Sequence, residues 1–63
     1  MYRIKLKRSS KNEFDEVIEV EGEMKALRKY CDFRKEEYFF GSLVKVVEEK
    51  EQNFASFCNS EFA

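Results

Sequence analysis

The stretch that decides the fold is YRIKLKR at residues 2–8, in which apolar and basic side chains alternate strictly. A period of two is typical of a β-strand with one buried face and one solvated face. A second stretch, FDEVIEVE at residues 14–21, places Phe14, Ile18 and Val20 on one face and most of its acidic residues on the other. The polar turn SSKN lies between the two stretches, so the sequence predicts an antiparallel β-hairpin.

The register of this hairpin follows from a turn centred near Lys11. A shift by one residue would exchange the two faces of each strand, so the parity is well specified, whereas registers shifted by two residues remain open. The expected pairs are Ile4 with Ile18 and Tyr2 with Val20 on the core side, and Arg3 with Glu19 and Lys7 with Asp15 on the solvated side.

A helix is expected after Gly22, which ends the second strand. Residues 23–31 place Met24, Leu27 and Cys31 on one helical face, with a tyrosine beside them. An acidic residue at the start and basic residues near the end suit the helix dipole. The apolar side of this helix is expected to cover the apolar face of the hairpin.

The second half of the chain is harder to interpret. Residues 38–47 are rich in β-branched and aromatic residues, which favours a third strand, although one long helix from about 37 to 58 remains an alternative. The polar residues 48–53 then predict a turn into a last short helix from Phe54 to Phe62. The expected fold is α+β: a single domain spanning 1–63, with an antiparallel sheet of about three strands (ββαβ), one packed helix and a short C-terminal helix.

The composition excludes several kinds of active site. The chain has no histidine, so Ser-His-Asp and Cys-His nucleophile systems and His-bearing zinc sites cannot form, and two cysteines cannot make a Cys₄ site. Its two glycines cannot build a phosphate-binding loop. Carboxylate pairs occur only between sequence neighbours, whose side chains diverge on a strand or helix. We therefore expect no enzyme activity, no metal and no cofactor.

The cysteines and the N-terminus indicate the compartment. Cys31 and Cys58 are too few for a disulfide framework, the N-terminus lacks the apolar run of a signal peptide, and no stretch approaches the roughly 20 apolar residues that span a bilayer. A cytoplasmic protein is expected, with both thiols reduced and packed as small apolar side chains. A single disulfide between them is the alternative.

Charge is distributed in blocks although the net charge is only −1. Residues 1–11 are basic, 12–24 acidic, 25–35 basic and 36–63 acidic. Adjacent antiparallel segments with such blocks can pair opposite charges across the strands. Alternatively, one block remains free as a contact surface for a partner.

Two kinds of binding remain possible for this surface. The first is nucleic-acid binding through the basic side of the first strand, with exposed aromatic rings for stacking, although the acidic pI of about 5.5 argues against it. The candidate residues for this contact are Arg3, Lys5, Lys7 and Arg8.

The second kind is protein binding. An acidic edge would occupy a basic groove, and the phenylalanines Phe54, Phe57 and Phe62 form either the lid of the core or a docking or dimer surface. The candidate residues of the acidic edge are Asp15, Glu19, Glu21 and Glu23.

In size, charge and predicted topology, the chain resembles the very short, acidic, cofactor-free ββαβ proteins with which viruses of bacteria inhibit host enzymes or defence systems. Anti-CRISPR proteins and inhibitors of host polymerases are examples. The resemblance implies a non-enzymatic inhibitor or regulator that binds a larger protein or ribonucleoprotein complex in the host cytoplasm by steric or acidic-mimic contact. No motif assigns a functional residue through it.

Overall fold

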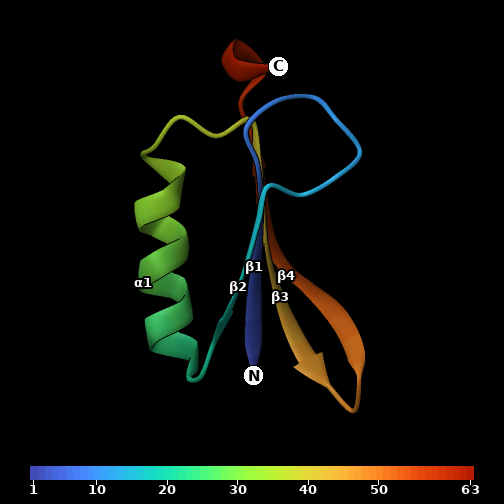
Figure 1. Cartoon of the computed structure of the whole chain (residues 1–63). Coiled ribbons are helices and arrows are strands. Elements are labelled where there is room, and N and C mark those ends of the chain that lie inside the picture. The colour runs from blue at the N-terminus through green and yellow to red at the C-terminus, as the bar shows by residue number, and fades with distance from the viewer.

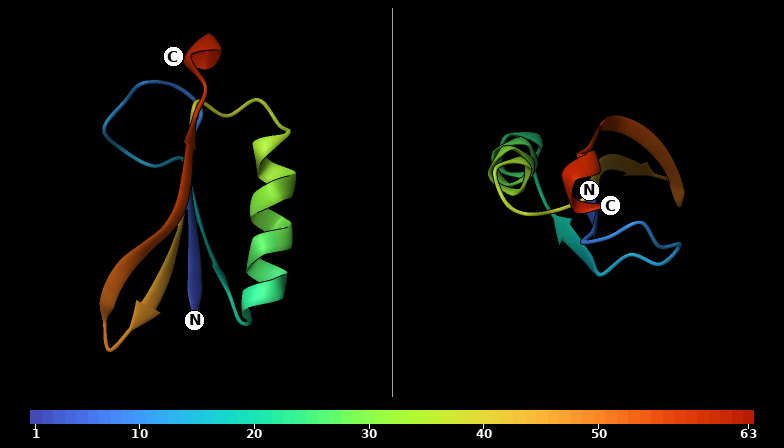
Figure 2. Two further views of the ribbon diagram at one scale, coloured as in Figure 1. Left: turned by 180° about the vertical axis from the view of Figure 1, so that it is seen from behind. Right: turned by 90° about the horizontal axis from the view of Figure 1, so that it is seen from above.

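The computed structural model describes residues 1–63 as an antiparallel sheet with one helix packed on it (Figure 1). The four strands lie in the order β2-β1-β3-β4, and α1 covers a single face of the sheet (Figure 2). The α+β class is therefore confirmed, with one strand more than expected. In chain order the elements are β1 (Tyr2–Lys7), β2 (Glu16–Val20), α1 (Glu23–Arg34), β3 (Phe40–Val47), β4 (Lys50–Cys58) and a 3₁₀ turn (Ser60–Phe62).

The register of the first hairpin is confirmed along most of its length. Tyr2 lies opposite Val20, Arg3 opposite Glu19 and Ile4 opposite Ile18. The predicted pairing of Lys7 with Asp15 is wrong, because the ladder ends one step earlier, at Leu6 and Glu16. The Asp15 carboxylate instead accepts a hydrogen bond from the backbone N–H of Arg8 and forms an ion pair with Lys11.

The alternating pattern predicted Phe14 in the core, and this prediction is wrong. The second strand begins at Glu16, so Phe14 belongs to the loop between β1 and β2. Its ring lies 6.4 Å from that of Phe40. Phe40 is paired with Lys7, on the face of the sheet opposite Ile4 and Leu6, so the loop carries Phe14 to the helix-free side.

The core lies between the sheet and α1, as the hairpin pattern predicted, and the predicted face of the helix is confirmed in part. Leu27 packs against the core as predicted, together with the buried Ala26 and Tyr30 and the partly buried Phe33. Met24 is instead 77% exposed, and Cys31 is also exposed. The helix continues beyond its predicted end to Arg34, which adds Phe33. Tyr30 and Phe33 thus place two aromatic rings between the helix and the sheet, and removal of their apolar surface from water stabilises the fold.

The predicted C-terminal helix from Phe54 to Phe62 is wrong for its first part, which belongs to β4, and the alternative of one long helix is wrong. β4 pairs with β3 along its whole length, with a bulge beside Leu43 and Val44. The hairpin turn consists of Glu48 and Glu49, which both have positive φ (51° and 66°). A two-residue turn of this kind matches the twist of the flanking strands. Only the end of the segment is helical, as a short 3₁₀ turn.

Candidate functional site

The helix-free face of the sheet carries a cluster of two phenylalanine rings around a lysine. The Nζ atom of Lys7 lies 4.9 Å from the ring centre of Phe14 and 5.4 Å from that of Phe40. Phe14 is 38% exposed, and Phe40 and Lys7 are each half-buried. We call Lys7, Phe14 and Phe40 the aromatic platform.

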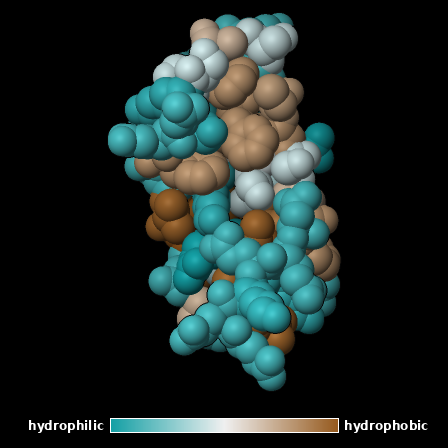
Figure 3. Space-filling model, turned by 90° about the vertical axis from the view of Figure 1, so that its right-hand side faces the viewer, coloured by the Kyte–Doolittle hydropathy of each residue, from teal (hydrophilic) through white to brown (hydrophobic).

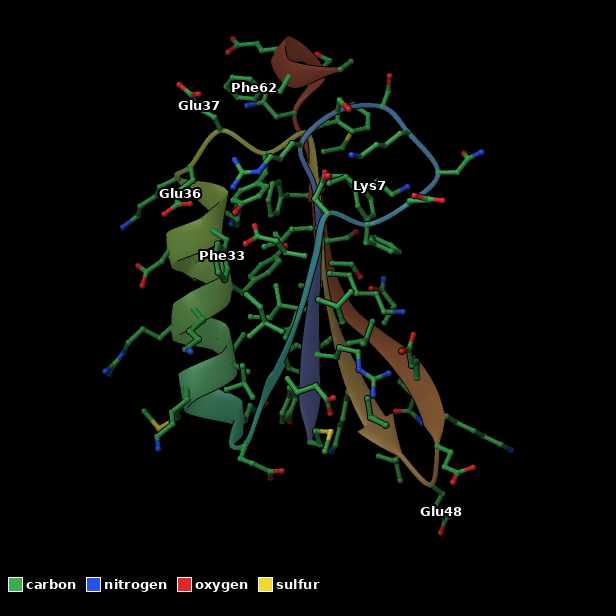
Figure 4. All side chains as sticks on the ribbon, in the orientation of Figure 1. Lys7, Phe33, Glu36, Glu37, Glu48 and Phe62 are labelled. Atoms are coloured by element: carbon green, nitrogen blue, oxygen red, sulfur yellow. The ribbon has the colours of Figure 1, made fainter.

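The platform occupies one end of the helix-free face. Apolar side chains gather there, at the end that bears the C-terminus, whereas the rest of this face is mainly hydrophilic (Figure 3). Lys7 projects from the sheet on the side away from α1, beneath the loop between β1 and β2 (Figure 4). Its neighbour across the sheet, Phe40, is in turn paired with the exposed Cys58.

Lys7 is the cation of β1 that has no acidic partner. None of the ion pairs in the structure includes it. Its contacts with the ring faces of Phe14 and Phe40 are cation–π interactions, each worth about 0.5–1 kcal/mol at exposed sites. These contacts orient the ammonium group without neutralising it, so it can still bind a carboxylate.

The other predicted basic residues of the sheet face are neutralised by acidic residues of β2 and β4. Glu51 accepts hydrogen bonds from Arg3 at 2.7 Å and from Lys5 at 2.5 Å. A longer ion pair of 3.7 Å joins Arg3 to Glu19. The hydrogen bonds from Lys5 and Arg3 hold the pKa of Glu51 below its ordinary value. This half of β1 therefore offers little free positive charge.

Arg8, the fourth predicted basic residue, belongs to a separate cluster. Its guanidinium lies 4.7 Å from the ring centre of Tyr38 and 3.6 Å from a carboxylate oxygen of Glu16. The Tyr38 hydroxyl donates a hydrogen bond to Glu16. Burial, together with this hydrogen bond, raises the pKa of Tyr38 to about 12. Arg8 thus helps to close one end of the core.

The raised pKa of Tyr38 predicts a loss of stability at high pH. In the unfolded chain the phenol ionises near its ordinary pKa of 10.0, whereas in the folded protein it stays neutral until about pH 12. The stabilisation is complete below pH 10 and is lost as the pH rises from 10 to 12. We expect the urea midpoint of the wild type to fall more between pH 9 and 11.5 than that of Tyr38→Phe. Equal falls in the two proteins would contradict this assignment.

The predicted acidic edge is not brought together as one surface. Asp15 precedes β2 and is held by its own loop, where hydrogen bonds from Lys11 and the Arg8 backbone lower its pKa. Glu19 lies on the helix-free face beside Arg3. Glu21 and Glu23 flank Gly22 beyond the opposite end of β2 and have no ion pair.

The C-terminal phenylalanines also lie in different places. Phe57 is half-buried, with its ring 5.8 Å from that of Tyr30, so it forms part of the lid of the core. Phe54 is 45% exposed and stands edge-on to Tyr2 at 5.9 Å. Phe62 lies at the C-terminal 3₁₀ turn, beyond the end of the sheet (Figure 4).

The two thiols are free, in agreement with the prediction, but both are exposed rather than packed. Cys31, Arg34 and Lys35 line an open surface depression of about 300 Å³. No group of three or more side chains is arranged as metal ligands. The single α-helix is neither long enough nor apolar enough to cross a membrane.

Sequence reasoning found the basic residues of the site but missed two of their partners. The alternating pattern puts Phe14 in the core, because Phe14 shares the parity of Ile18. The polar residues 48–53 predict a turn, so the sequence does not show that Glu51 belongs to a strand and pairs with Arg3 and Lys5.

Comparison with protein-family models, curated proteins and solved structures finds no match for this chain.

Proposed function

We propose that the chain is a small, non-enzymatic protein-binding module that docks through the aromatic platform. The observation that carries this proposal is the unpaired Lys7 ammonium between the partly exposed rings of Phe14 and Phe40. Aromatic side chains provide large contact areas at low entropic cost, and they are enriched among the residues that dominate binding energy at protein interfaces.

The platform suits a partner segment with a carboxylate next to apolar side chains. A carboxylate can pair with Lys7, while its apolar neighbours cover the two rings and exclude water. Exclusion of water strengthens the ion pair, because the effective dielectric constant around it falls. Lys7 and Phe40 lie on adjacent strands of the sheet, so their backbone positions are fixed before binding.

Charge on the helix-free face favours a protein partner over a nucleic acid. Nucleic-acid affinity depends mainly on basic residues that neutralise phosphates. Here Glu51 binds both Arg3 and Lys5, and the chain has a net charge of −1. Lys7 alone cannot follow a phosphate backbone.

The role that fits this docking mode is inhibition or regulation of a larger protein. A bound module of this size covers a surface that the larger protein needs for another contact. The resemblance in size and charge to small viral inhibitors of host enzymes and defence systems supports this role, including the anti-CRISPR kind.

A peptide-display selection against the immobilised protein tests the docking surface. We expect the selected peptides to carry Asp or Glu beside an apolar residue. Phe14→Ser should weaken their binding about tenfold, because loss of a buried aromatic anchor typically costs more than 1 kcal/mol. Titration of a selected peptide followed by fluorescence anisotropy measures the change in Kd.

Met24→Ser is the matched control, because it removes an even more exposed apolar side chain from the helix on the other face. It should leave the Kd unchanged. Peptides that bind Phe14→Ser as tightly as the wild type would contradict the proposal. Tight binding of a single-stranded oligonucleotide, with strong salt dependence, would favour the nucleic-acid alternative instead.

A further inference from the structure

α1 carries positive charge that no other part of the chain neutralises. Residues 23–35 contain five basic residues and only two acidic residues. All five are exposed, and none takes part in an ion pair or a side-chain hydrogen bond. By contrast, every basic residue of the first hairpin except Lys7 has an acidic partner. We use the name basic side of α1 for the five residues Lys25, Arg28, Lys29, Arg34 and Lys35.

The basic side of α1 faces solvent, because the other side of the helix packs on the sheet. Ala26 and Tyr30 are buried, and Phe33 packs against the same core. Successive residues of a helix are turned by about 100°, which places Arg28 roughly opposite Tyr30, and Lys35 roughly opposite Ala26. No other element covers α1 on the side away from the sheet (Figures 1 and 2).

These charges do little to stabilise the helix itself. Only Arg34 and Lys35, at the C-terminal end, suit the helix dipole. Lys25 lies in the first turn, where the dipole disfavours a cation, and like charges at the spacing of Lys25 and Lys29 destabilise a helix. Asp32 forms no ion pair with its basic neighbours. The positive charge is therefore available to an anionic partner.

We propose that the basic side of α1 binds the phosphate backbone of a nucleic-acid duplex, without sequence preference. α1 has 12 residues and is therefore about 18 Å long. A DNA duplex carries one negative charge for about every 1.7 Å of its axis, so several phosphates lie within reach of the helix. Arg34 and Lys35 line, together with Cys31, the open depression at the end of α1, where both can donate hydrogen bonds to phosphate oxygens.

The side chains of α1 favour a duplex over other anionic partners. Single strands are held largely by aromatic rings that stack on the bases, whereas the rings of Tyr30 and Phe33 pack against the core. Helices on membrane surfaces insert an apolar face into the lipid, but the apolar face of α1 is covered by the sheet. Protein interfaces are poor in lysine and depend on apolar or aromatic anchors, and α1 exposes only Met24 as a large apolar side chain.

The net charge of −1 does not oppose this contact, because it describes the whole chain rather than one face. At about 0.1 M salt, exposed charges act over roughly 10 Å. The shortest dimension of the molecule is 15 Å. The acidic residues on the helix-free face of the sheet are therefore largely screened from a duplex that lies against the outside of α1.

Fluorescence anisotropy of a labelled duplex of mixed sequence tests the proposal at salt concentrations from about 20 to 200 mM, with DNA and RNA duplexes to tell the two sources of phosphate apart. We expect the affinity to fall steeply with salt. Arg28→Gln with Lys35→Gln should lower the slope of log K against log salt by about two, because each phosphate contact contributes about 0.9. Glutamine retains high helix propensity, and circular dichroism should show a folded variant. A wild type that binds neither duplex at the lowest salt overturns the proposal.

Lys45→Gln with Lys50→Gln is the matched control, since it removes the same charge from two exposed lysines of the β3–β4 hairpin that also lack ion pairs. It should leave the slope unchanged. Asp32→Asn should tighten binding, because it removes an acidic group from α1. Equal changes in the two double variants would show that only net charge matters and would overturn the assignment to α1. Tighter binding of a single strand, of polyglutamate or of anionic lipid vesicles would overturn the choice of a duplex.

Alkylation of the two free thiols locates the contact in the wild type. Cys31 lies beside Arg34 and Lys35, whereas Cys58 is paired with Phe40 of the aromatic platform. Iodoacetamide is neutral, so the charge of the duplex does not repel it. Mass spectrometry should show that the duplex slows alkylation of Cys31 several-fold and leaves that of Cys58 unchanged. Protection of Cys58 alone, or of neither thiol, overturns the proposal. The aromatic platform lies on the opposite face of the sheet from α1, so this result is independent of the proposed function.

Discussion

Replacing Gly41 with alanine is expected to lower the free energy of unfolding by about 2–3 kcal/mol, the upper range for overpacking a core. Gly41 lies opposite Phe57 in the β3–β4 ladder, and the ring of Phe57 covers its backbone. A Cβ atom at position 41 would lie 2.1 Å and 2.5 Å from two ring carbons of Phe57. Two carbon atoms that are not bonded to each other cannot approach so closely, so the ring must move.

The cost arises because Phe57 is held from its other side as well. Its ring packs against Tyr30 of α1 at 5.8 Å, so moving it away from residue 41 disturbs the contact between the helix and β4. Urea unfolding followed by circular dichroism measures the loss. In a Phe57→Leu background the same substitution should cost less, because a smaller and more flexible side chain can give way. Equal costs in the two backgrounds would show that the ring is not the cause.

The contact of Gly41 with Phe57 also explains why β4 was not predicted from the sequence. A phenylalanine that covers a glycine on the neighbouring strand is a known stabilising device of sheets, but it is non-local and leaves no periodic signal. The phenylalanines of this segment also fit helical spacing. Local periodicity therefore predicted a helix for this segment, whereas pairing with β3 makes it a strand.

The first hairpin was predictable because its signal is entirely local. The alternation in residues 2–8 fixed which side chains face the core, and the register of Ile4 and Tyr2 then followed from the turn. The same alternation placed Arg3, Lys5 and Lys7 on the solvated face. It could not show which acidic residues neutralise them, because Glu51 reaches this face only through β4.

The aromatic platform was beyond prediction for a related reason. Phe14 lies outside the strand, where the period of two no longer determines its face. The loop carries its ring across to Phe40, which is far away in sequence. The basic half of the site was thus visible in the sequence, whereas its aromatic half depends on the path of a loop.

The turn between β3 and β4 provides the other large effect, which is a gain in stability. Glu48 and Glu49 both adopt positive φ, at 51° and 66°. This left-handed conformation costs roughly 1–2 kcal/mol for a residue with a Cβ atom, and Asn-Gly is the pair that suits such turns best. We expect Glu48→Asn with Glu49→Gly to raise the free energy of unfolding by about 1–2 kcal/mol. Urea unfolding at neutral pH measures the gain.

Removal of two carboxylates from an acidic chain could stabilise it for electrostatic reasons alone, so the control must remove the same charge elsewhere. Glu36 and Glu37, in the connection between α1 and β3, are also adjacent, exposed glutamates (Figure 4). Neither has a positive φ. Glu36→Asn with Glu37→Gly should therefore give no comparable gain, because glycine there only adds freedom to the unfolded chain. If both double variants gained equally, relief of charge repulsion rather than of backbone strain would be the cause.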